Sequence, residues 1–143
     1  MDEPLWMNLS DALVAHDLEL ATHGGATGVR DQGMLESALA RAKNIWAYAE
    51  APPRLTQLAA AYAFGISSNH PFVDGNKRTA LVISFAFLDV NGLEVTATQE
   101  DAYLTILGLA AGEVSEPELA QWFEHNTTPR QTTEPRSGPP LKA

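Results

Sequence analysis

The sequence predicts an all-α fold: a compact single domain of about six helices, with one polar loop between two buried central helices. Apolar residues recur at helical spacing through most of the chain, and short stretches rich in glycine, proline or asparagine separate the periodic segments. Residues 55–68 and 79–90 are apolar on nearly every side, which is typical of helices in the centre of a domain. Alternation of the kind found in strands is almost absent, although residues 93–96 could form a short extended piece.

Capping signals mark the other helices of the predicted bundle. Ser10 can accept a hydrogen bond from the first turn of the first helix, and Gly24 can end that helix in a left-handed conformation. Ser115 and Glu118 have the spacing of a capping box at the start of the last helix. The four outer helices are expected over residues 11–22, 34–49, 98–111 and 115–125.

Composition limits the functions that the chain can have. The formal net charge of −9 argues against direct binding to nucleic acid, which needs a basic face. The absence of cysteine excludes disulfides, cysteine-based zinc sites and a thiol nucleophile. No stretch predicts a membrane span or a signal peptide, so a cytoplasmic location is expected. Residues 1–126 are expected to form the domain, and residues 127–143, rich in Thr, Pro and Arg, a disordered tail.

The loop between the two central helices, residues 70–80, has the features of an anion site. Its Lys77 and Arg78 are the only Lys or Arg residues between Arg54 and Arg130. Gly75 lets the backbone approach an anion closely, and the helix that follows begins with N–H groups that have no partner inside the helix. Phosphate is the anion that such a combination of backbone N–H groups, lysine and arginine suits best.

Two further residues of this loop could carry chemistry. His70 could accept a proton from a hydroxyl group, and Asp74 could bind Mg²⁺ together with phosphate oxygens. A base, a metal ligand and an anion site within nine residues predict phosphoryl or nucleotidyl transfer. The alternative is that Asp74 is only a helix cap, that Lys77 and Arg78 are solvated, and that His70 makes a structural hydrogen bond. A histidine four residues before an aspartate also weakly matches some acyltransferase motifs, but these leave both cations unexplained.

Outside the loop, few residues are candidates for the site. The glycine-rich segment 24–33 is either a simple connection or a mobile flap over the site. Of the other histidines, His16 is expected on a helix surface and His125 at a helix end, while His23 could lie near the site.

The stretch His70-Pro71-Phe72-Val73-Asp74-Gly75-Asn76-Lys77-Arg78 closely resembles the signature of the Fic/Doc family, in particular its Doc branch. Residues 23–25, 28–31, 35–40 and 61–65 also resemble segments of Doc proteins, and the likeness extends over residues 9–125. The resemblance implies an all-helical fold and a toxin of a type II toxin–antitoxin system. It also implies Mg²⁺ as cofactor and ATP or another nucleoside triphosphate as co-substrate.

The same resemblance assigns roles by position. It implies that His70 is the base, Phe72 the core anchor and Asp74 the magnesium ligand, and that Gly75, Asn76, Lys77 and Arg78 bind phosphate. The full Fic signature has glycine in place of Lys77 and a second arginine in place of Leu81, and members that transfer AMP use both. Because the chain follows Doc at both positions, we expect phosphate transfer to a Ser/Thr hydroxyl of a target protein such as elongation factor Tu. Protein adenylylation is the second hypothesis, and a non-catalytic nucleotide-binding module is the third.

The resemblance also bears on regulation. Many Fic proteins carry an inhibitory helix with the pattern Ser/Thr-xxx-Glu-Gly/Asn. Thr96 and Glu100 fit its start, but Asp101 follows, so the pattern fails. We therefore expect inhibition in trans by a Phd-like antitoxin, and a translation factor as the target.

Overall fold

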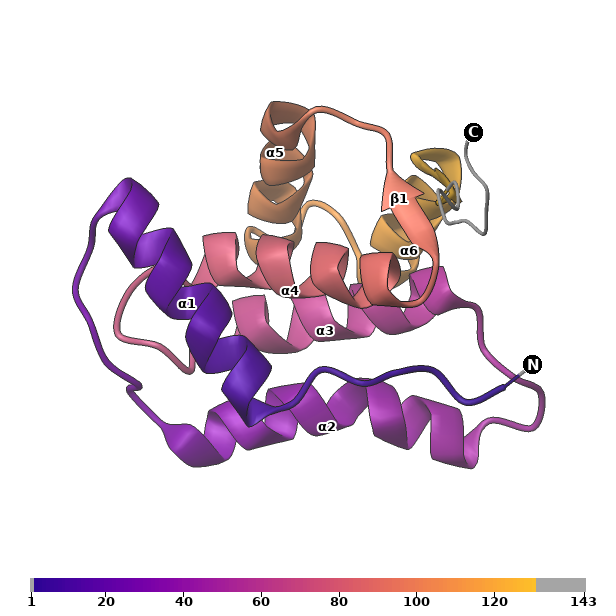
Figure 1. The fold of residues 1–143 in the computed structure, drawn as a ribbon, viewed down its shortest axis with the longest axis horizontal. Coiled ribbons are helices and arrows are strands. Elements are labelled where there is room, and N and C mark those ends of the chain that lie inside the picture. Colours follow the sequence, from indigo (N-terminus) through magenta and orange to yellow (C-terminus); the bar gives the residue numbers. More distant parts are fainter. Residues whose placement is uncertain (1, 131–143) are drawn as a thin grey trace, which may run out of the picture.

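The computed structural model describes residues 2–130 and confirms the all-α prediction. Its described part consists of six helices and one two-stranded sheet (Figure 1). In chain order the elements are α1 (Leu9–His23), α2 (Gln32–Tyr48), α3 (Leu55–Asn69), α4 (Asn76–Val90), β1 (Leu93–Val95), α5 (Gln99–Ala110), α6 (Glu116–His125) and β2 (Thr127–Pro129).

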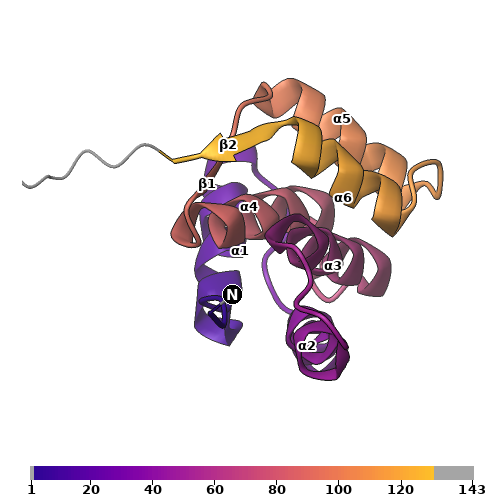
Figure 2. The same ribbon diagram turned by 90° about the vertical axis from the view of Figure 1, so that its right-hand side faces the viewer.

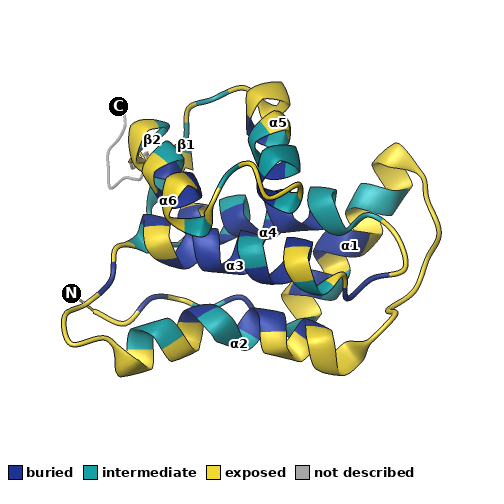
Figure 3. Ribbon diagram, turned by 180° about the vertical axis from the view of Figure 1, so that it is seen from behind, coloured by how far each residue is buried: buried dark blue, intermediate teal, exposed yellow. Residues whose placement is uncertain are grey.

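Helices α3 and α4 form the centre of the domain, as their all-round apolar sequences predict. Seen end-on, they lie between α2 on one side and α5 and α6 on the other (Figure 2). Every residue from Leu58 to Ala63 is fully buried, so α3 has no solvent-facing side along this stretch (Figure 3). A Cβ atom at Gly65 would lie 3.1 Å from the backbone of Ala38, so this glycine allows α2 and α3 to pack closely.

The N-terminal segment is held in place by two polar contacts with the central helices. The Tyr62 hydroxyl accepts a hydrogen bond from the Met7 N–H at 3.0 Å, and the Leu5 N–H donates to the Asn91 side chain at 2.9 Å. Burial raises the pKa of Tyr62 to about 12. Neutral Tyr62 is therefore part of the folded core at any ordinary pH.

Two helices begin earlier than predicted. Asn8, not Ser10, caps α1, and it forms a capping box with Asp11. Asp31 caps α2, which starts at Gln32 instead of Met34. The predicted capping box of Ser115 and Glu118 is confirmed at α6.

The prediction of a disordered tail from residue 127 was wrong for its first residues. β2 pairs antiparallel with β1, with Val95 opposite Thr127 and Leu93 opposite Pro129. Arg130 adds a backbone hydrogen bond to Gly92 and an ion pair with Asp89 at 3.1 Å. The expected domain boundary at residue 126 thus falls inside a chain segment that pairs with the domain, and residues 131–143 of the predicted tail lie outside the described residues.

Within residues 2–130, no helix has both the length and the apolar character that crossing a lipid bilayer requires.

Candidate active site

The loop between α3 and α4 lies at one end of the molecule, beside the connection from α1 to α2 (Figure 1). His70 is the C-cap of α3 and has φ 48° and ψ 55°, a left-handed conformation unusual for a residue other than glycine. Its N–H still donates to the carbonyl oxygen of Ile66 at 3.2 Å. The helix therefore ends at Asn69, and His70, which follows as its C-cap, is exposed.

Phe72 of this loop lies in the hydrophobic core. Its side chain is 1% exposed. The side-chain amide of Asn76 brackets the backbone of Phe72: its Oδ1 accepts from the Phe72 N–H at 2.9 Å, and its Nδ2 donates to the Phe72 carbonyl at 3.0 Å. Because this amide is already engaged, Asn76 could contact an anion only through its backbone N–H.

The start of α4 provides backbone donors for an anion. Gly75 is the N-cap, with φ 78°, and no side chain caps this helix end. The N–H groups of Asn76, Lys77 and Arg78 have no acceptor within the described residues. Three donors at the positive end of a helix dipole, with two cationic side chains beside them, could bind phosphate. The alternative in which Asp74 serves as the N-cap does not match this geometry.

Asp74 instead links the loop to the glycine-rich segment. Its Oδ1 accepts from the Gly75 N–H at 2.8 Å and its Oδ2 from the Ala26 N–H at 3.1 Å. Within residues 2–130, no group of three His, Cys, Asp or Glu side chains could hold a metal ion. A single carboxylate beside an anion site is nevertheless the kind of site that suits Mg²⁺ carried on phosphate oxygens.

The segment between α1 and α2 runs along the site loop and is bonded to it. Val29 and Phe72 form an antiparallel bridge, and the Val73 N–H donates to the Gly28 carbonyl at 3.0 Å. The side chain of Arg30 donates to two carbonyl oxygens at the end of α3, that of His70 at 2.7 Å and that of Asn69 at 2.8 Å. This segment is thus more than a connection, because it holds the backbone of the candidate base.

His16 is buried, so the prediction of a surface position was wrong. It is 2% exposed, and its ring stacks on that of Phe72 with centroids 3.9 Å apart and an interplanar angle of 9°. Its Nε2 lies 2.8 Å from the carbonyl oxygen of Asp74. Since a carbonyl oxygen can only accept, this ring nitrogen carries the proton. The signal that could have revealed this role is the spacing of His16 four residues after the apolar Ala12, which places both on one face of the helix.

The side chains of Lys77 and Arg78 line different pockets. His70 and Lys77 line a pocket of about 520 Å³, whose opposite wall is formed by α5. Arg78 lines a second pocket of about 590 Å³ with residues of α1, α4 and β1. Its guanidinium carbon lies 4.0 Å from the centre of the Tyr103 ring, and its Nη1 lies 3.4 Å from His23 Nε2. Arg78 is therefore packed against neighbours, not simply solvated, and His23 lies near the site as expected.

The fold and this site define the class of protein. The chain belongs to the Fic/DOC family, whose model matches residues 6–88, from the N-terminal segment to the end of the buried part of α4. The matched range contains the whole site loop.

Two relatives narrow the resemblance to the Doc branch. Over 110 residues the chain is 36% identical to Protein kinase doc of Escherichia phage P1, a match that covers 77% of this chain and 86% of that protein. Over 92 residues it is 38% identical to Toxin Doc of Mycolicibacterium smegmatis, covering 64% of this chain and 68% of that protein. The predicted likeness to Doc proteins is confirmed.

Proposed function

We propose that this protein is a Doc-like toxin that transfers phosphate from a nucleoside triphosphate to a Ser or Thr hydroxyl of a target protein. The observation that carries the proposal is that His70 and Lys77 line one pocket beside the unpartnered N–H groups of α4. A proton acceptor and a phosphate-binding turn then face the same space. The similarity to a relative named a protein kinase supports phosphate transfer.

In this proposal each residue of the loop has a defined task. His70 accepts the proton of the attacking hydroxyl, whose oxygen forms a bond to the terminal phosphorus as the bond from that phosphorus to the bridging oxygen breaks. Gly75 lets the backbone approach the phosphate closely, and the backbone N–H groups of Asn76, Lys77 and Arg78 bind its oxygens together with the Lys77 and Arg78 side chains. The products are a phosphorylated protein and a nucleoside diphosphate.

Asp74 would hold Mg²⁺ in this site. When bound, Mg²⁺ neutralises charge on the phosphate oxygens during transfer. The Ala26 and Gly75 N–H groups already orient the Asp74 carboxylate at the turn. Orientation of the metal ligand by backbone groups supports a preformed site, because no side chain must be reorganised before the nucleotide binds.

The choice of phosphate over AMP transfer depends on two positions. Lys77 adds charge where adenylylating family members have glycine, and its side chain lines the pocket of His70. Leu81 is almost fully buried and offers no donor where those members have a second arginine. Protein adenylylation remains the second hypothesis, since the resemblance to the family includes the elements of both reactions, and a non-catalytic nucleotide-binding module is the third.

The proposal extends to partners and location. A toxin needs an antitoxin, and we propose a Phd-like protein that acts in trans. The proposed target is a translation factor such as elongation factor Tu, which would place the protein in the cytoplasm. We propose no direct contact with nucleic acid, because the net charge of −9 disfavours it.

Labelled nucleotides test this function directly. A translation extract incubated with the protein and γ-labelled ATP should yield one labelled protein, whose mass increases by one phosphate. Label that is transferred only from α-labelled ATP, with a gain of AMP, would establish adenylylation instead. His70→Ala should abolish both labelling and growth arrest; if it arrests growth as the parent does, the non-catalytic hypothesis holds.

A further inference from the structure

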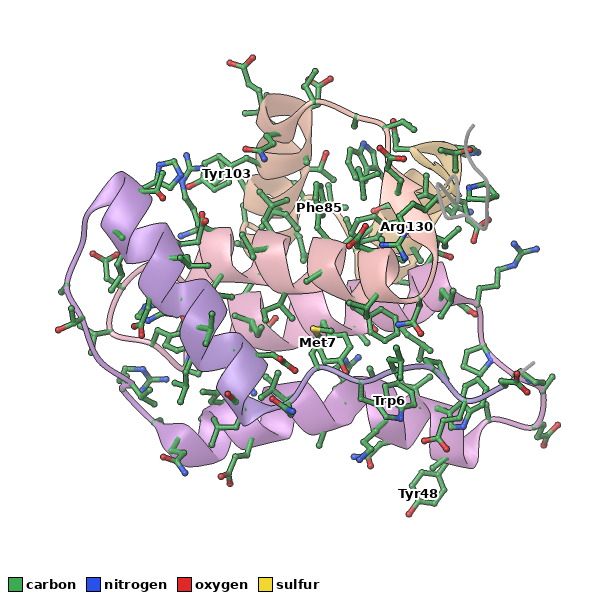
Figure 4. All side chains as sticks on the ribbon, viewed as in Figure 1. Trp6, Met7, Tyr48, Phe85, Tyr103 and Arg130 are labelled. Atoms are coloured by element: carbon green, nitrogen blue, oxygen red, sulfur yellow. The ribbon has the colours of Figure 1, made fainter. Side chains whose placement is uncertain are left out.

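We propose that Tyr103 of α5 is a positioning residue for Arg78 and thereby sets the affinity of the site for a nucleoside triphosphate. The inference rests on the proposed function, and it assigns a role to a residue outside the family's signature loop. Its basis is the contact between the Arg78 guanidinium and the Tyr103 ring at 4.0 Å. Tyr103 extends from α5 toward the C-terminal end of α1 (Figure 4).

The position of the guanidinium over the ring face suits an arginine that must bind an anion. When a guanidinium group lies over an aromatic ring, the ring contacts the face of the guanidinium. The N–H donors lie in the plane of the guanidinium and point away from the ring, so they stay free to bind an anion. One of these nitrogens, Nη1, lies 3.4 Å from His23 Nε2. The ring of Tyr103 and the imidazole of His23 thus contact the group from two sides. The remaining donors are left for phosphate oxygens.

The surroundings of Arg78 explain why such support is needed. The pocket that it lines also contains the carboxylates of Glu19, Asp89 and Glu94. Asp89 is paired with Arg130, and Glu19 lies 3.7 Å from His23. Without the Tyr103 ring, Arg78 is free to turn toward these acids, and an ion pair with one of them would cancel the charge that the anion site needs. The stacking contact therefore keeps the guanidinium available.

The test measures the dissociation constant for ATP–Mg²⁺ by calorimetry on the full chain, so it does not require turnover. Tyr103→Leu should weaken binding about three- to tenfold, the range for loss of a partly exposed cation–π contact. Tyr103→Phe keeps the ring and should stay within about twofold of the parent. Tyr48→Leu is the matched control, because Tyr48 lies on α2 and is 86% exposed. In a phosphorylation assay, KM for ATP should rise with kcat nearly unchanged.

A double-mutant cycle separates positioning from a general structural role. In an Arg78→Ala background, Tyr103→Leu should have no further effect on ATP binding. If Tyr103→Leu weakens binding equally in both backgrounds, or if it leaves binding unchanged while Arg78→Ala weakens it, the inference is wrong and the proposed function stands. If the parent itself binds no nucleotide, both fail. Should Tyr103→Leu lower the unfolding temperature by several degrees, Tyr103→Met takes its place with the same expected outcomes.

Discussion

Gly25 and Gly24 offer a matched pair of substitutions that tests the link between the glycine-rich segment and Asp74. Both glycines have positive φ, +124° and +78°, so alanine is strained at either position. A Cβ at Gly24 would meet nothing within 4 Å, whereas a Cβ at Gly25 would lie 2.8 Å from Asp74 Oδ2. Only Gly25→Ala must therefore displace the carboxylate and break its hydrogen bond from the Ala26 N–H.

The expected magnitudes differ enough to be measured. Backbone strain should lower the free energy of unfolding by about 1–2 kcal/mol in each variant. Loss of a hydrogen bond to a charged group adds about 1.5–3 kcal/mol in Gly25→Ala alone. In the proposed site Asp74 binds Mg²⁺, and a displaced carboxylate binds the metal less well. A loss of about 1.4 kcal/mol of binding free energy corresponds to a tenfold higher dissociation constant for Mg²⁺. We expect the Mg²⁺ concentration for half-maximal activity to rise about tenfold or more in Gly25→Ala and little in Gly24→Ala.

Urea unfolding and phosphate transfer measured against Mg²⁺ concentration are the two assays. Equal loss of stability in both variants would mean that the carboxylate yields to the new methyl group at no cost. An unchanged Mg²⁺ requirement in Gly25→Ala, at temperatures where the variant is folded, would refute the role of the Asp74 position in metal binding.

Three further substitutions test the packing and the site. Gly65→Ala places a methyl group against the Ala38 backbone and should lower the free energy of unfolding by about 1–2 kcal/mol, after the better helix propensity of alanine is counted. A higher free energy of unfolding in a urea titration would contradict this packing. Because the pKa of Tyr62 is raised to about 12, the native state retains its proton longer than the unfolded chain does. The stabilisation by neutral Tyr62 is complete below pH 10 and is lost as the pH rises through 12. Tyr62→Phe should therefore remove this loss of stability at high pH. At pH 7 the same substitution should lower the free energy of unfolding by about 1–3 kcal/mol, because the Met7 N–H loses its acceptor. A profile that keeps the same fall would exclude Tyr62 as its source. His16→Phe keeps the stacking on Phe72 but loses the donor to the Asp74 carbonyl, and it should lower the free energy of unfolding by about 1–3 kcal/mol. His16→Ala loses both contacts and should lower it further. Equal losses of stability for the two variants in thermal unfolding would show that the stacking contributes nothing.

The part of the fold that local sequence determines was predicted correctly. Residues 55–68 and 79–90 are apolar all round, and such helices can be satisfied only in the centre of a domain. The site loop lies between them because it joins them in sequence. The core position of Phe72 was expected from the resemblance of this loop to the family signature.

What the sequence did not reveal depends on contacts between distant segments. His16 looks like a surface residue in a helical pattern, and its burial depends on stacking on Phe72 and on the hydrogen bond to the Asp74 carbonyl, both of which come from a distant segment. The strand at Thr127 has no apolar alternation, and its pairing with Val95 is a matter of backbone hydrogen bonds alone. Arg78 has the same appearance in the sequence whether or not a tyrosine of α5 lies beneath it.

The hydrogen bonds from Arg30 to the end of α3 suggest a way in which a partner could inhibit the enzyme. Its guanidinium donates to the carbonyl oxygens of Asn69 and His70, so the backbone at the candidate base is tied to a segment some forty residues earlier in the chain. A partner that draws Arg30 away from α3 would remove both of these hydrogen bonds from the backbone at the base. Inactivation then requires no competitor for the nucleotide.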